Sequence, residues 1–180
     1  MVSEPVKAFR DLVRLLNRYP EDAFLFVREG LGIAAERRHG PETEAHRSLH
    51  QFLAEHDLDF EGLHHLYNAG ELDESIIQVI QAAGGWEKIN RHVSGRDLCW
   101  ALRDSALLRW GVLARTVLDS WNIRDTYDIG RIVFGFIDFE LMRKQEKDNL
   151  DDFRDVFNFA EAFDEPFRSG LPILEDGDRC

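Results

Sequence analysis

Three apolar segments in the second half of the chain decide its fold: SGRDLCWALRDSALLRWG (94–111), VLARTVLDSW (112–121) and TYDIGRIVFGFIDFEL (126–141). The third carries the strongest helical signal, because its apolar residues recur at alternating steps of three and one. These residues are Ile129, Ile132, Val133, Phe136 and Ile137. We therefore predict three consecutive helices joined by short turns.

The residues that flank these segments predict where the helices begin and end. Ser94 begins a capping-box-like sequence, and Thr126 is the expected N-cap of the third helix. After that helix the period fails, and 141–145 and 153–157 are candidate strands of one short β-hairpin. Three helices before a hairpin is the order of a winged helix-turn-helix. The sequence therefore predicts a winged-helix-like part over 92–160.

The first forty residues predict two further helices. An apolar stripe marks 6–17, and it ends at Tyr19 because a residue before proline avoids the helical conformation. The second helix, 21–38, begins with acidic residues and ends with Arg37 and Arg38, which complements the helix dipole. We therefore predict a mainly α, helical-bundle fold that forms a single domain over 1–168.

Residues 40–90 are predicted to be an acidic helical insert in that domain. Helical patterns occupy 42–55, 59–68 and 73–83; Gly40 precedes the first, and Gly70 and Gly84 end the second and third. Within 41–80 there are nine acidic residues and a single basic one. The last twelve positions, 169–180, are rich in Gly, Pro and Asp, and they are predicted to form a mobile tail.

Charge and composition exclude several classes of protein. The net charge is −12, with 34 acidic against 22 basic residues, so the surface repels nucleic acid and favours basic partners or serves solubility alone. No leader pattern and no apolar run long enough to span a membrane occurs. Cys99 and Cys180 lack the spacing of a metal site or disulfide framework, which predicts a cytoplasmic protein.

The histidines offer one weak metal hypothesis. Six of the seven fall within 39–65, and His46 and His50 are one helical turn apart, a spacing that can chelate a divalent ion. A third ligand is not evident from the sequence, and solvated surface histidines explain the same pattern. No cofactor is predicted.

Nucleophilic and phosphate-binding motifs are also missing from the sequence. Ser94, Ser105 and Ser120 are explained by helix positions, and Cys99 by an apolar setting in which thiols are inert. No glycine-rich phosphate loop occurs. We therefore expect no catalytic residues.

The face of the third helix opposite its apolar stripe carries Tyr127, Arg131, Phe134 and Asp138. One arginine against one aspartate does not suit DNA, whereas exposed Tyr, Phe and Arg suit a protein interface. Burial within the chain explains the same face equally simply. Trp100 and Leu107 likewise project from the side of their helix away from Leu98, which predicts a central core helix.

Four strings resemble one bacterial family: YPEDAFLFVREG (19–30), HVSGRDLCWALR (92–103), IGRIVF (129–134) and DFRDVF (152–157). The family has been described from planctomycetes and verrucomicrobia, and no activity is implied by it. The resemblance covers about 19–38 and 91–163, and it implies a bacterial origin. The departure is 40–90, which is longer than the family's usual link between the two blocks.

These observations lead to three functional hypotheses. The first is a non-enzymatic protein–protein interaction or adaptor module that uses Tyr127, Arg131 and Phe134 to bind another protein or a second copy. The second is a metal-dependent protein or enzyme that uses the histidine-rich insert. The third is nucleic-acid binding through the helix-turn-helix-like part.

Overall fold

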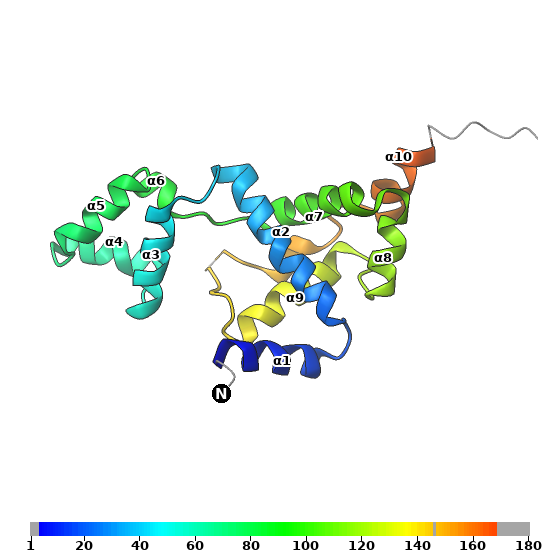
Figure 1. Cartoon of the computed structure of the whole chain (residues 1–180), viewed down its shortest axis with the longest axis horizontal. Coiled ribbons are helices and arrows are strands. Elements are labelled where there is room, and N and C mark those ends of the chain that lie inside the picture. The colour runs from blue at the N-terminus through cyan, green and yellow to red at the C-terminus, as the bar shows by residue number, and fades with distance from the viewer. Residues whose placement is uncertain (1–3, 146, 169–180) are drawn as a thin grey trace, which may run out of the picture. The chain divides into compact units, whose positions relative to one another are not determined.

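A computed structural model describes residues 4–145 and 147–168, which are mainly helical and contain no strand (Figure 1). The mainly α class predicted from the sequence is therefore confirmed. The chain divides into two compact units, one made of Met1–Gly32 with Ser94–Cys180 and the other of Ile33–Val93. The tail predicted at 169–180 lies outside the described residues.

The first unit contains the helices predicted from the apolar patterns at both ends of the chain. Its longer elements are α1 (Glu4–Leu16), the first part of α2 (Glu21–His39), α7 (Gly95–Trp110), α8 (Ala114–Ser120) and α9 (Thr126–Asp138). Its short turns of helix are η1 (Gly111–Leu113), η2 (Leu150–Phe153), η3 (Ala160–Asp164) and α10 (Glu165–Arg168). None of the helices described in either unit is both long and apolar enough to cross a membrane.

Phenylalanine rings of α1, α2 and α9 form part of the core of the first unit. Phe24 is fully buried, and its ring centroid lies 6.2 Å from that of Phe9 and 5.9 Å from that of Phe136, both edge-on. Phe9 and Phe136 stack at 6.3 Å, which agrees with the neighbouring positions of α1 and α9 in Figure 1. Such pairs add roughly 0.5–1.5 kcal/mol each beyond the burial of their area.

Two glycines allow neighbouring elements to pack directly on a helix backbone. A Cβ atom on Gly130 would lie 2.7 Å from Cγ of Phe153, so η2 packs against α9 only because this side chain is missing. A Cβ atom on Gly30 would overlap the side chain of Leu102 in α7. Close packing therefore explains why α2 keeps a residue that weakens an isolated helix by about 1 kcal/mol relative to Ala.

The predicted N-cap of α9 is wrong by one residue. Asp125 caps the helix, because its carboxylate accepts a 2.8 Å hydrogen bond from the backbone N–H of Asp128. Thr126 is the first helical residue, and its buried hydroxyl accepts a 3.2 Å hydrogen bond from the N–H of Val156. Asp and Thr are both good N-caps, so the sequence does not distinguish them.

The hairpin expected from 141–145 and 153–157 does not form in the described part of the chain. Asn149 instead starts η2, because its side chain accepts a 3.0 Å hydrogen bond from the N–H of Asp151. Short polar side chains that bond nearby backbone in this way favour turns over strands. The wing of the predicted winged-helix-like part is therefore absent from the described residues, and that architecture is not confirmed.

The second unit has an apolar core of its own. After the end of α2 it contains α3 (Glu44–Glu55), α4 (Phe60–Ala69), α5 (Glu74–Ala82) and α6 (Trp86–Ile89). Its core residues are Leu49, Leu53, Leu63, Ile80, Ala83 and Ile89. Gly70 ends α4 in the left-handed conformation (φ 70°), as its position in the sequence predicts. The predicted insert, 40–90, falls within this unit, and α6 was not predicted.

Candidate functional site

The aromatic face predicted on α9 is in contact with cations of its own unit. The guanidinium carbons of Arg131 and Arg154 each lie 4.9 Å from the ring centroid of Tyr127. Nζ of Lys144 lies 5.9 Å from the ring of Phe134. Tyr127, Arg131 and Phe134 are all partly buried. The structure therefore brings Arg131 onto Tyr127, and it gives Phe134 a different cation.

Arg131 also belongs to a buried polar network around Asp128, which is only 1% exposed. Oδ1 of Asp128 accepts hydrogen bonds from the hydroxyl of Tyr19 at 2.7 Å and from Nη2 of Arg18 at 2.9 Å. The same oxygen accepts from Nη1 of Arg131 at 3.1 Å. Oδ2 accepts from the backbone N–H of Arg124 at 2.9 Å. A buried carboxylate with this many donors is fully compensated.

The same contacts fix the ionisation of both acidic groups. Burial, with the hydrogen bond and charge of Asp128, raises the pKa of Tyr19 to about 12. Burial alone would raise the pKa of Asp128, but hydrogen bonds from the Arg124 backbone and Tyr19 and the charge of Arg18 outweigh it and lower that pKa. A general base needs a pKa near the working pH and access to substrate, and Asp128 has neither. The network around Asp128, which we call the clamp, therefore has a structural role: it joins the residues that donate to this carboxylate.

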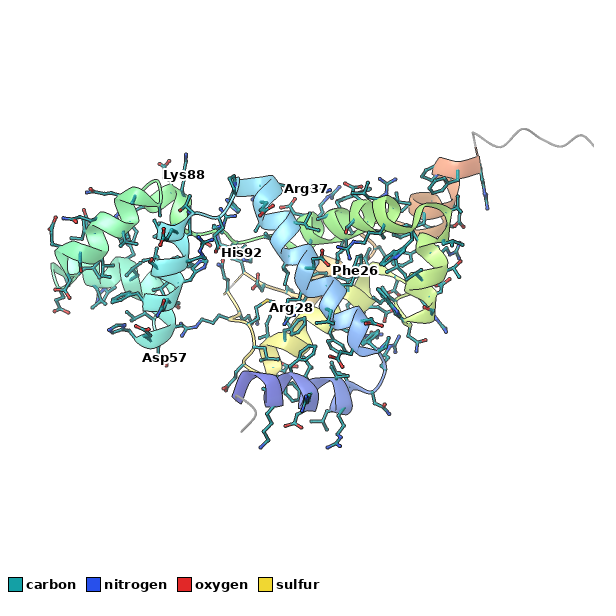
Figure 2. The ribbon with its side chains drawn as sticks, viewed as in Figure 1. Phe26, Arg28, Arg37, Asp57, Lys88 and His92 are labelled. Carbon is teal, nitrogen blue, oxygen red and sulfur yellow. The ribbon has the colours of Figure 1, made fainter. Side chains whose placement is uncertain are left out.

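His46, the first of the two metal candidates, is a buried structural residue of the second unit. Its Nδ1 accepts a 3.2 Å hydrogen bond from the N–H of Thr43, so we assign the ring proton to Nε2. Nε2 then donates to the carbonyl of Lys88, a residue labelled in Figure 2, at 3.2 Å. Both ring nitrogens are engaged, and neither can bind a metal without losing a bond.

His50, the second metal candidate, lies on the exposed side of α3. Its Nδ1 lies 3.7 Å from Oε1 of Glu42, and burial lowers its pKa despite that carboxylate. A zinc site needs at least three protein ligands, and no group of three or more His, Cys, Asp or Glu side chains suited to a metal occurs in 4–145 and 147–168.

The potential nucleophiles have structural environments. Cys99 is fully buried, and burial raises the pKa of its thiol to about 12, which leaves it in the unreactive protonated form. Ser94 caps α7, where its Oγ accepts a 3.1 Å hydrogen bond from the N–H of Asp97. Oγ of Ser120 donates to the carbonyl of Val117 at 2.6 Å.

Three apolar side chains that are close together in sequence are exposed to solvent where α7 ends. Leu108 is 89% exposed, Val112 66% and Leu113 59%. The chain changes direction at Gly111, whose φ of 53° suits glycine, and continues through η1 into α8. We call the set of Leu108, Val112 and Leu113 the apolar knuckle.

The apolar knuckle is flanked by a tightly packed aromatic cluster. The ring of Trp110 lies 5.2 Å from that of Phe26 (labelled in Figure 2) and 5.4 Å from that of Trp121. An ion pair between Arg109 and Glu29 joins α7 to α2 beside it. The packing of Trp110 therefore holds the backbone in the middle of the segment that carries the knuckle.

Sequence patterns did not identify the apolar knuckle. The helix at 94–111 was predicted to be central because it is apolar on two sides, yet Trp100 is 38% exposed and Leu108 is almost fully exposed. The available signal was local: four apolar residues, Leu108, Trp110, Val112 and Leu113, lie within six positions around Gly111, where a helix ends and fewer neighbouring side chains can cover them.

Comparisons with known proteins return no match, whether with family models, curated proteins or solved structures.

Proposed function

We propose that this chain is a non-enzymatic module that binds another protein, and that the apolar knuckle is its contact surface. The observation that carries the proposal is the joint exposure of Leu108, Val112 and Leu113. Single exposed apolar residues such as Leu15 are common on protein surfaces, whereas three within six positions of the sequence are unusual and favour a contact site.

The knuckle has the energetic properties of a small interface centre. Complete burial of a leucine or valine side chain stabilises a complex by roughly 1.5–3 kcal/mol. Because the aromatic cluster of Phe26, Trp110 and Trp121 holds the backbone, little conformational entropy is lost on binding. A few such residues usually supply most of the binding energy of an interface.

Local charge also permits a protein partner at this place. The knuckle lies within 81–137, which has eight basic and six acidic residues, between acidic blocks at 41–80 and 138–165. A second copy would therefore meet no strong repulsion there, and self-association is the simplest form of the proposal.

Tyr127, Arg131 and Phe134 remain predicted interface residues. A partner at that face would contact the cations that cover the rings and not the rings themselves. The support for an interface there is therefore weaker than for the exposed apolar side chains of the knuckle. The metal hypothesis is less well supported, since His46 already uses both ring nitrogens. Nucleic-acid binding gains no support from the apolar knuckle. The resemblance to the bacterial family stays a prediction, and it implies no activity.

Sedimentation velocity tests the proposal, first on purified protein and then on labelled protein added to an extract of its host. Wild type should sediment faster than a 20.9 kDa monomer in at least one setting. Leu108→Asp combined with Leu113→Asp should sediment as a monomer in both, while Leu15→Asp should behave as wild type. A wild type that is monomeric in both settings contradicts the proposal, and so does an unchanged knuckle variant.

A further inference from the structure

The second unit carries an exposed aromatic platform, formed by Tyr67 and His64 of α4 and Trp86 of α6. The ring centroid of Trp86 lies 4.9 Å from that of Tyr67 and 5.1 Å from that of His64. Trp86 packs on the core of the unit, whereas Tyr67 is 41% exposed and His64 is exposed. The platform is therefore attached to the core through Trp86 and reaches solvent at Tyr67 and His64.

This platform differs from the aromatic rings of the first unit, many of which lie under a cation of their own unit. Arg18 covers Tyr19 at 5.5 Å, Arg103 covers Trp100 at 6.0 Å, and two arginines cover Tyr127 at 4.9 Å. The cation–π contacts found in the described residues all belong to the first unit. Among the described residues, no Arg or Lys therefore lies over the ring of Tyr67 or of Trp86.

The second unit is acidic and has few cations, and Lys88, which is on the same short helix as Trp86, makes none of the described cation–π contacts. Residues 33–93 include eleven acidic and five basic residues, and Arg91 is already bonded through Nη2 to the carbonyl of Gly40 at 2.8 Å. In the sequence, Glu71 is two positions after Ala69, the last residue of α4, and Glu87 directly follows Trp86. Acidic surroundings with open aromatic faces attract a cation from elsewhere.

We propose that the platform of Tyr67 and Trp86 binds an arginine side chain in a basic peptide segment of another protein. The planar guanidinium stacks on an aromatic face, and the acidic unit around it adds long-range attraction that salt screens. Arginine fits better than lysine because its charge is spread over a plane and is less strongly hydrated. This surface lies in a different unit from the apolar knuckle and does not depend on it.

An arginine–glycine repeat peptide is the probe, and the same peptide with citrulline in place of arginine is its uncharged control. Binding to the full chain is followed by calorimetry and by the indole N–H resonance of Trp86, which Trp86→Phe identifies. We expect saturable binding at low salt that shifts this resonance. Tyr67→Leu should weaken binding about fivefold to tenfold, and Tyr67→Phe, which keeps the ring, should bind as wild type.

The matched control for charge alone is Glu55→Gln, an exposed acidic position on α3. It should weaken binding far less than Tyr67→Leu. Three results would overturn the proposal: binding that leaves the Trp86 resonance unmoved, equal binding of the citrulline peptide, or a folded Tyr67→Leu variant that binds as wild type. If a variant fails to fold, the test still rests on whether the peptide shifts the Trp86 resonance of the wild-type chain.

Discussion

The hydroxyl of Tyr19 donates a 2.7 Å hydrogen bond to Oδ1 of Asp128, which lies 109 positions further along the chain. The bond joins the connection between α1 and α2 to the first turn of α9. Arg18 adds a second bond from the same connection at 2.9 Å. Asp128 therefore joins the connection between α1 and α2 to α9 through two side-chain hydrogen bonds.

Replacing Asp128 by asparagine should destabilise the fold strongly. The amide cannot accept from all four donors, and it would leave the guanidinium of Arg18 without its counter-ion. We expect the free energy of unfolding in urea to fall by roughly 2–4 kcal/mol. Asp151→Asn is the matched control, because its pair with Arg154 is exposed and solvent-screened and should contribute little to stability. Equal effects of the two substitutions would show that the clamp contributes no special stability.

Tyr19 should make the fold sensitive to alkali. Its native pKa of about 12 exceeds the ordinary value of 10.0, so the folded state holds the proton more tightly than the unfolded state. This contribution is fully present below pH 10 and is lost as the pH rises from 10 to about 12. The stability difference between wild type and Tyr19→Phe, measured by urea unfolding, should shrink over that interval. A difference that stays constant from pH 8 to pH 12 contradicts the assignment.

Gly130 and Gly32 should respond in opposite directions to alanine. A methyl group at Gly130 would lie 2.7 Å from Cγ of Phe153 and 2.9 Å from Cδ1 of Leu150, so the variant should lose about 1–3 kcal/mol. A methyl group at Gly32 meets nothing within 4 Å and should raise helix stability by about 0.5–1 kcal/mol. Thermal unfolding of both variants checks this. A neutral Gly130→Ala would mean that η2 does not pack on α9 as described.

His46 should act as a structural residue and not as a metal ligand. His46→Ala removes the bonds to Thr43 and Lys88 and should lower the free energy of unfolding by about 1–3 kcal/mol. His50→Ala should have little effect, because that side chain is exposed. Added zinc should leave the midpoint of thermal unfolding of the wild type unchanged. A zinc-dependent increase that both substitutions abolish would support the metal hypothesis instead.

Local patterns predict the helices of this chain well, because helix spacing and caps depend on residues a few positions apart. The stripe from Ile129 to Ile137 and the cap at Ser94 are examples. The partner of Tyr19 could not be predicted, since it lies in another element and leaves no periodic trace. The exposure of Leu108 could not be predicted either. A helix that is apolar on two sides is buried on both only where other elements cover both sides, and the sequence does not show which elements those are.

Site-specific photo-cross-linking tests the proposed contact surface most directly. Benzoylphenylalanine replaces Leu108 in one variant and Leu15 in another, and both are irradiated in host cells; each replaced residue is largely exposed, so neither change should disturb the fold. A discrete cross-linked band, of one partner or of a second copy, should form from position 108 and not from position 15. No band from position 108, or the same band from both positions, would contradict the assignment of the apolar knuckle as the binding surface.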